Sequence, residues 1–412
     1  MKKLPCLIAA ILISWCSNAA EKASPDSSKG KEYSFILQDS PALISTMRQS
    51  NENLLSFYRL GVRALNQNVS HEVSSWIQIA GAFLFIPLTH EEGHRSILSA
   101  KGIGSISRPY FNKEGAGYVY GVTDQTLQDL RTTDLKSYIR LHTAGLESDY
   151  TLWCRESNLI YEQKEDLEVL QMELLYRKFT LMSYYLYGLL GANINITEEA
   201  NELDRDIVGH DVYGAIKNLY RPAETFYRYT DYRDLTSTEK KYAKRVGMLT
   251  LLNMVDPLMY SRKAKPFTTQ NGLRYALGYN MCPFGDYVDE RFWWKKNGFL
   301  TEFYFRQYQN RTHFFPEIGL SFPELLHSGP FQSNLSLTAW SQPKDLLFES
   351  TTSQLGGSAD LRLQYVYVPR QKNSLKAISF DLGLVAKTQG FMVEETSMGN
   401  HFGIRFGTSV WW

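Results

Sequence analysis

The last third of the chain, residues 271–412, alternates apolar and polar side chains with a period of two. That period is typical of β-strands whose two faces meet different surroundings. Turn residues separate the runs, and Asn297-Gly298 between two alternating runs is a strong hairpin signal. We expect about eight antiparallel strands of about ten residues each between residues 270 and 412.

The two runs before the last divide apolar from polar side chains. An apolar outside and a polar inside are features of small outer-membrane β-barrels, which have an even number of strands. A soluble antiparallel barrel or sandwich is the alternative. The apolar set is Leu361, Leu363, Tyr365, Tyr367, Ile378, Phe380, Leu382 and Leu384, and the opposite set is Asp360, Arg362, Gln364, Ser379, Asp381 and Gly383.

The chain ends in HFGIRFGTSVWW, where apolar side chains again alternate with small or polar ones. The positions of Arg405, Gly407, Val410 and the terminal Trp412 give the spacing polar-x-Gly-x-x-apolar-x-aromatic. This spacing resembles the closing-strand signal by which outer-membrane barrels are recognised for insertion. The resemblance implies two partners, the lipid of the outer membrane and the barrel-assembly machinery.

The first residues, MKKLPCLIAAILISWCSNAA, combine two lysines, a short apolar core and small residues at the end. This pattern predicts a secretory signal peptide at residues 1–20, followed by a linker at residues 21–40. We therefore expect an exported protein of a Gram-negative envelope. Cys16 could mark a lipoprotein, but the bulky Trp15 precedes it. Cys154 and Cys282 remain, either as one bridge or as two free thiols.

The charges are balanced, with 44 basic and 43 acidic residues. A nucleic-acid-binding protein would carry a basic excess, so we expect no nucleic-acid partner.

Residues 41–265 show helical patterning, and only residues 108–124 suggest a short hairpin. No apolar stretch in this part reaches the length of a comfortable membrane-spanning helix. We predict an α+β protein: an all-helical domain at residues 41–265, which the signal peptide leads us to expect in the periplasm, and a C-terminal antiparallel β-barrel at residues 270–412. The expected helices are residues 42–68, 72–101, 126–160, 163–194, 202–219 and 238–262.

The sequence FLFIPLTHEEGH ends in an HExxH pattern, His90-Glu91-Glu92-Gly93-His94. On a helix, His90 and His94 project from one face. Two imidazoles one turn apart supply half of a tetrahedral zinc shell, and Glu91 can take a proton from metal-bound water. The apolar run before the motif places it in a buried region, where polar groups need partners. The alternative is a solvated turn after a core helix.

A zinc site of this kind needs a third ligand. In residues 134–153, His142 and Asp149 fall on the apolar helical stripe, while Glu147 falls on a face that we expect to be solvated. His142 and Asp149 are candidates for the site, or they satisfy each other as a buried pair. Gly145 between them allows a close helix approach.

Two further segments carry candidates. In LTLLNMVDPLMYS, Asp256 is either a metal ligand or the cap of an Asp-Pro turn. In DRDIVGHDVYGA, which also holds Asp206 and Asp211, His210 either caps a helix or lines a pocket, and a solvated loop is the preferred interpretation.

Three short motifs resemble those of the site-2-protease type of metallopeptidase. THEEGHRSILSAKGIG is similar to its first motif, AGLESD to its second and NMVDP to its third. The resemblance implies zinc held by His90, His94 and Asp256, with Glu91 as the base. Asp149 falls where that family has an asparagine.

The chain departs from this family at two points. Leu146 stands where the family has proline, and Pro257 stands where it has glycine. The family also lies within helical membrane proteins. Another group of HExxH enzymes, the zincins with a glutamate ligand on a later helix, would assign the third position to Glu147.

These observations predict an outer-membrane-associated zinc metalloendopeptidase whose substrates are envelope polypeptides. The alternative is a non-catalytic outer-membrane barrel protein with a helical periplasmic domain.

Overall fold

The structure is a computed structural model that describes residues 30–108, 117–194, 198–260, 271–297, 299–369 and 375–412. The expected signal peptide at residues 1–20, the first part of the linker and the tip of the hairpin at residues 108–124 lie outside the described residues.

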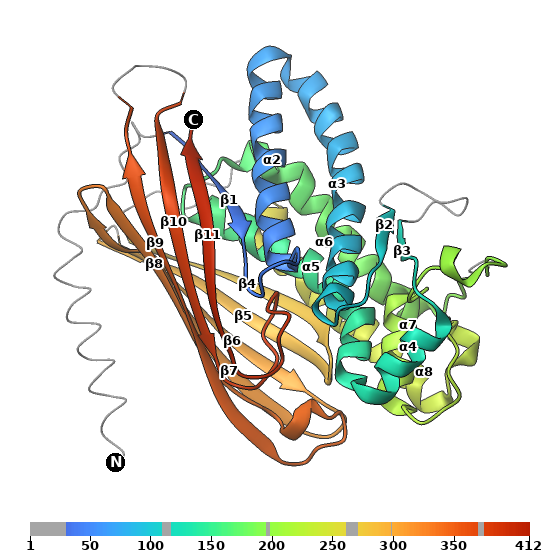
Figure 1. Cartoon of the computed structure of the whole chain (residues 1–412). Helices are drawn as coiled ribbons and strands as arrows, with labels where there is room; N and C mark the ends of the chain where they lie inside the picture. The colour runs from blue at the N-terminus through green and yellow to red at the C-terminus, as the bar shows by residue number, and fades with distance from the viewer. Residues whose placement is uncertain (1–29, 109–116, 195–197, 261–270, 298, 370–374) are drawn as a thin grey trace, which may run out of the picture.

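The chain is an α+β protein, with helices packed on the concave side of one curved antiparallel sheet (Figure 1). The α-helices of the described residues all precede the large block of strands, as predicted. Their bounds are α2 (Met47–Asn68), α3 (His71–Ala100), α4 (Asp124–Thr133), α5 (Leu135–Tyr161), α6 (Leu167–Leu190), α7 (Asp211–Tyr220) and α8 (Ser237–Leu249).

The sheet has nine strands in the order β1-β11-β10-β9-β8-β7-β6-β5-β4. Strands β4 to β11 are the predicted eight, and β1 lies within the segment that was expected to be a linker. The bounds are β1 (Glu32–Gln38), β4 (Gly272–Cys282), β5 (Gly285–Lys296), β6 (Phe299–Gln309), β7 (Phe314–Ser328), β8 (Phe331–Pro343), β9 (Ser353–Tyr367), β10 (Ala377–Lys387) and β11 (His401–Trp411). A separate hairpin pairs β2 (Ile106–Arg108) with β3 (Tyr118–Tyr120).

The prediction of a closed barrel is wrong, because β1 and β4 form opposite edges of an open sheet. Side chains of α2 occupy the hydrogen-bonding groups along β1. The amide of Asn53 accepts from the N–H of Ile36 at 2.7 Å and donates to its carbonyl at 2.9 Å. Ser56 Oγ donates to the carbonyl of Ser34 at 2.6 Å. A helix therefore covers the edge where another strand would have to pair.

The β4 edge is covered in the same way by the 3₁₀ helix η4 (Thr250–Met254) and the residue after it. Asn253 Oδ1 accepts from the N–H of Tyr279 at 2.8 Å, and its Nδ2 donates to the carbonyl of Tyr279 at 3.1 Å. The N–H of Leu277 donates to the carbonyl of Val255 at 2.9 Å. Residues of the helical part therefore cover both edges of the open sheet.

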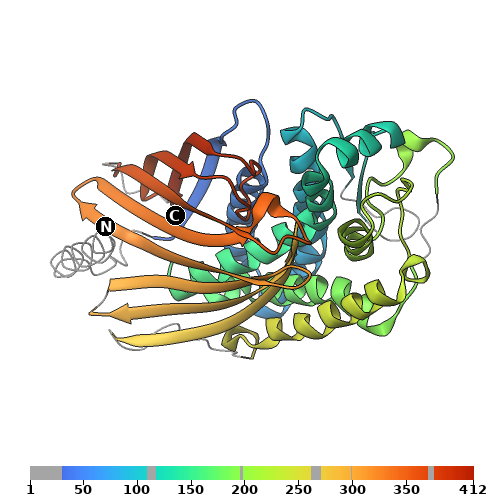
Figure 2. The ribbon, with the colours of Figure 1, turned by 90° about the horizontal axis from the view of Figure 1, so that it is seen from below.

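Helix α5 runs through the centre of the molecule, between the sheet and the other helices (Figure 2). It begins at Asp134, whose carboxylate accepts from the N–H of Ser137, and this cap divides the predicted helix 126–160 into α4 and α5. Tyr150 Oη donates to Asp289 Oδ2 on β5 at 2.7 Å. Helix α5 is buried on all sides, with the sheet on one side and α3 on the other. Its contact with β5 therefore helps to fix its position against α3.

Helix α3 confirms the predicted helix 72–101 to within one residue at each end and contains the HEEGH motif. By length and composition alone, Glu72–Ala100 meets the criteria for a helix that can cross a membrane, in contrast to the sequence expectation. Only 39% of its most apolar window is buried, and a single such helix is weak grounds for a membrane span. The two cysteines, Cys154 and Cys282, are free and buried.

Candidate metal centre

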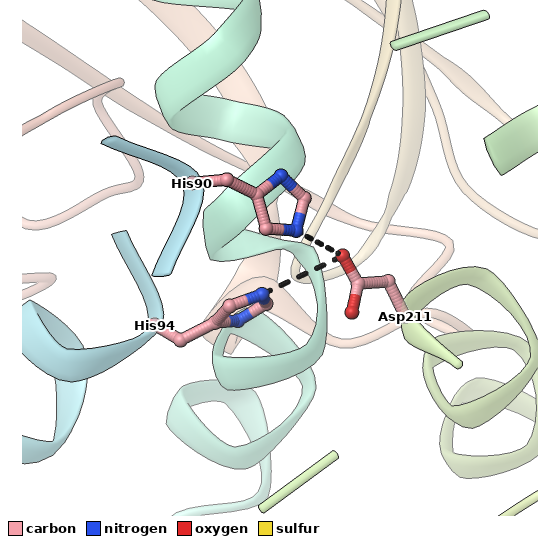
Figure 3. Close-up of side chains that lie close together, drawn as sticks. All are labelled: His90, His94 and Asp211. Atoms are coloured by element: carbon pink, nitrogen blue, oxygen red, sulfur yellow. Dashed lines mark hydrogen bonds and ion pairs between the residues drawn. The ribbon is translucent and has the colours of Figure 1, made fainter. Parts of the chain in front are cut away.

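Helix α3 brings His90 and His94 to one face, one turn apart, as predicted. Their rings converge on the carboxylate of Asp211, which comes from the first turn of α7 (Figure 3). Asp211 Oδ2 lies 3.0 Å from His90 Nε2 and 3.5 Å from His94 Nε2. The ligand atoms of these three residues all lie within 4.8 Å of one another, and the residues are buried. This group can hold a metal ion.

The other ring nitrogen of each histidine meets an acceptor. His94 Nδ1 lies 2.6 Å from the carbonyl oxygen of Leu141, which can only accept, so Nδ1 carries the proton. His90 Nδ1 lies 2.7 Å from Asp149 Oδ2. Hydrogen bonds of this kind orient the imidazoles of metal sites and leave Nε2 as the ligand atom. Two such nitrogens and one carboxylate form a donor set suited to zinc.

Two glycines allow α5 to approach the histidines closely. A Cβ atom on Gly145 would overlap His90 Nε2 and lie 2.5 Å from His94 Nε2. A Cβ atom on Gly93 would lie 2.5 Å from the carbonyl oxygen of Ala144. The helices can therefore reach this separation only where both positions lack a side chain.

Asp149 is held from its other side by Arg177, whose Nη1 donates to Asp149 Oδ1 at 2.6 Å. Arg177 also forms an ion pair with Glu173, and all three side chains are fully buried. The predicted site residue Asp149 thus contacts His90 directly and has a fixed orientation.

Burial and charge act in opposite directions on the three donors. Burial alone would lower the pKa of His90, but Asp149 and Asp211 outweigh it and hold that pKa well above 6.5. The pKa of His94 is raised as well, because Asp211 outweighs burial. Burial would raise the pKa of Asp211, yet the two imidazoles hold it far below its usual range. The carboxylates therefore favour the protonated form of each imidazole against the effect of burial.

Glu91 lies beside the donors, under the β2–β3 hairpin. A Cβ atom on Gly117 would lie 3.1 Å from Glu91 Oε1. Burial raises the pKa of Glu91 to about 7, although His90 and His94 oppose the rise. Asp206 lies close enough to affect Glu91, and burial raises its pKa to about 6.

The structure places Asp256, the predicted third ligand, away from the two histidines. Its Oδ2 accepts from Lys178 Nζ at 2.6 Å and from Trp153 Nε1 at 3.1 Å, and its Oδ1 accepts from the N–H of Leu258. Asp256 thus caps an Asp-Pro turn, the alternative that the sequence left open, and neutralises a buried lysine. Asp211 takes the position beside the imidazoles.

Glu147 also points elsewhere. It binds Arg140, with an Oε2–Nε distance of 2.9 Å, and accepts from the N–H of Glu394. The expectation that this face of α5 is solvated was wrong, because Arg140 and Glu147 are each 1% exposed under the β10–β11 loop. That loop comes almost 250 residues later in the chain, so the local sequence pattern around Glu147 could not predict that it covers this face.

The two remaining histidines border the site without joining the three donors. His210 caps α7, with Nδ1 accepting from the N–H of Tyr213, so the preferred solvated loop was wrong and the capping alternative is confirmed. His142 is buried against Gly214, and neither ring nitrogen has a hydrogen-bond partner among the described residues. Asp149 therefore does not pair with it. Burial lowers the pKa of His142 to about 3 and that of His210 to about 4.

The comparisons with known proteins add no relative. The chain matches no family model, no curated protein and no solved structure. The site therefore has to be interpreted from its own geometry.

Sequence reasoning mentioned Asp211 but did not select it. Asp211 stands in the first turn of an apolar helix, where an acidic residue is ordinary because the helix dipole favours it, so nothing in the local sequence indicated that it lies beside the imidazoles. Arg177 had no signal that distinguished it from the neighbouring Lys178.

We predict that Gly145→Ala weakens zinc binding at least about tenfold, because the new methyl group displaces both Nε2 atoms; changes behind metal ligands commonly cost 10–100-fold. Zinc affinity measured by competition with a chromogenic chelator checks this. Gly61→Ala in α2 is the matched control, because a Cβ there meets nothing within 4 Å. Equal affinities for the two variants would contradict the close approach.

Asp256→Asn should lower the free energy of unfolding by about 3–5 kcal/mol, because it leaves Lys178 buried without its counter-ion. Burial already lowers the pKa of Lys178 to about 8. The zinc content of the folded variant should not change. Denaturant unfolding and elemental analysis measure the two effects. Adding Lys178→Met should restore stability. Loss of zinc from the folded Asp256→Asn variant would contradict this assignment and indicate that Asp256 is a metal ligand.

Zinc affinity should rise as the pH rises above about 6.5, because Nε2 of each imidazole must lose its proton to bind metal and the pKa of both imidazoles is raised above that value. Since the folded pKa of His90 is raised, its ion pairs stabilise the metal-free protein fully below its unfolded pKa of 6.5 and are lost as pH rises through the folded value. The stabilisation by zinc should therefore grow with pH. Melting temperatures with and without zinc test this, and a pH-independent difference would contradict it.

Proposed function

We propose that this chain is a zinc-dependent hydrolase that cleaves peptide bonds, with envelope polypeptides as substrates. The observation that carries the proposal is the buried group of His90, His94 and Asp211 with Glu91 next to it on the same helix. The expected signal peptide supports an envelope location.

Each residue has a separate part in this proposal. His90, His94 and Asp211 would hold the ion, and Asp149 with Leu141 would keep Nε2 of each imidazole directed at it. A bound zinc ion acidifies water and polarises a carbonyl group. Glu91 would accept the proton of the attacking water and pass it to the leaving amine, which is the work of a general base.

The HEEGH motif supports assignment to the HExxH metallopeptidases. The first motif resembles that of the site-2-protease type, and Asp149, which falls where that family has an asparagine, contacts His90. Its third motif does not supply the carboxylate near the histidines, because Asp211 lies there. The proposal therefore concerns the chemistry and not membership of that family.

The donors are closely surrounded, with Glu91 6% exposed and His94 1% exposed. A polypeptide reaches the site only in a conformation that uncovers Glu91. We therefore expect slow turnover of the isolated protein, limited by that opening and not by the bond-breaking step.

Glu91→Gln should keep zinc and lose hydrolysis by about 10²–10⁴-fold, because the amide cannot accept the proton. Release of dye from a fluorescein-labelled unfolded protein measures hydrolysis, and elemental analysis measures zinc. Glu92→Gln is the matched control: Glu92 is the next residue, binds Arg95 and should retain activity within about twofold. Equal activity of the wild type and Glu91→Gln would refute the role of Glu91 as the base. Zinc binding without hydrolysis in the wild type would indicate a structural metal site.

A further inference from the structure

The sheet carries its apolar side chains on the face that points away from the helices. The cross-strand register places outward residues of neighbouring strands side by side, from β5 to β11. Phe380 is 71% exposed, whereas its neighbour Asp381 is 8% exposed. Glu290 and Gln307 are outward-facing polar exceptions. The exposed apolar face is represented by Trp294, Phe305, Ile318, Leu363, Phe380 and Ile404.

The concave face has the opposite character. Arg306 forms two hydrogen bonds to Asp289, at 2.6 Å and 2.8 Å, and both side chains are buried. Arg362 pairs with Asp381, and Gln364 is 3% exposed. In a sheet packed between a core and water, the polar side chains would face outward. Here they face the helices, so the polarity is inverted.

A large convex apolar face is costly in water and indicates a surface that is covered in the cell. An edge-to-edge contact with a second copy is blocked, because α2 and η4 occupy the hydrogen-bonding groups of both edges. Face-to-face contact between two copies is limited, since two convex surfaces touch over a small area (Figures 1 and 2).

A lipid bilayer suits this face better. Within hydrocarbon, backbone polar groups must be satisfied inside the protein, and side chains of α2 and η4 satisfy groups of Ser34, Ile36 and Tyr279 on the two edges. Strands β4 to β11 each have 11 to 15 residues, which is at or above the length of a tilted strand that crosses a bilayer. Trp294, Tyr367 and Trp412 are exposed and lie at or next to the strand ends on the side where the described chain terminates, and aromatic side chains favour the boundary between lipid and water.

We propose that the convex face of β4 to β11 lies against the acyl chains of a bilayer, with the helices and the metal centre on the polar side of the sheet. The wall is completed by α2 and η4 and not by strand closure. This inference does not depend on the metal or on hydrolysis, so either proposal can fail alone.

Spin labels on single introduced cysteines test the proposal. The labelled variants are Phe380→Cys and Ile404→Cys on the convex face, and the control is Lys241→Cys on an exposed turn of α8. Unmodified protein gives the background, since Cys154 and Cys282 are buried. The full-length mature chain is reconstituted in vesicles of phosphatidylethanolamine and phosphatidylglycerol. Relaxation by oxygen, which concentrates in lipid, is compared with relaxation by a water-soluble nickel complex.

We expect oxygen to relax the convex-face labels several times more strongly than nickel does, and the reverse for the Lys241→Cys label. Equal nickel access at all three positions would overturn the proposal. Spin–spin broadening at Phe380→Cys that disappears on dilution with unlabelled protein would overturn it too, because a second copy would then cover the face.

A second pair of variants removes the dependence on labelling. Phe380→Glu combined with Ile404→Glu should reduce flotation with vesicles at least about tenfold, since charge on a lipid-facing position is unfavourable. Lys241→Glu should float like the wild type. Circular dichroism confirms that both variants keep the sheet, and unchanged flotation of the folded double variant would contradict lipid contact.

Discussion

The separation between α3 and α5 determines most of what this molecule can do. Gly93 and Gly145 leave no side chain between the two helices at the level of the histidines. The approach brings Asp149 and the carbonyl of Leu141 to the imidazole Nδ1 atoms, and this fixes the nitrogens that remain as ligands. The sheet enters through α5, because Tyr150 on that helix is tied to Asp289 on β5. Helix α5 thus contacts both the sheet and the candidate metal site.

The site concentrates charge where water is scarce. Asp149, Asp211, Asp206 and Glu91 surround two imidazoles, and among the described residues Arg177 forms the ion pair with Asp149. Such a cluster is stable when protons or a metal ion neutralise it. The excess of buried negative charge raises the pKa of His90, and burial raises the pKa of Glu91. The two imidazoles lower the pKa of Asp211. A divalent cation would neutralise this excess of charge and leave unprotonated the residues that the proposed hydrolysis needs.

Features that depend on neighbouring residues were predictable, and features that depend on distant ones were not. The alternation at Leu363, Gln364 and Phe380 correctly divided the two faces of the sheet, since a strand's side chains alternate regardless of what covers them. The His90–His94 pair followed from helical geometry. Asp211 was missed because it is supplied 121 residues beyond His90. The open sheet was missed because nothing in β1 signals that α2 will cover its outer edge.

The pairing of β1 with β11 joins the two ends of the described chain. Lys31 and Trp412 exchange backbone hydrogen bonds at 3.1 Å in both directions. Among the described strands, β1 pairs with β11 alone, so the strand that α2 covers depends on a partner from the far end of the described residues. Contacts of such sequence separation form slowly. We therefore expect the β1–β11 pair to form late in folding, after the local contacts within the helices and between the other strands.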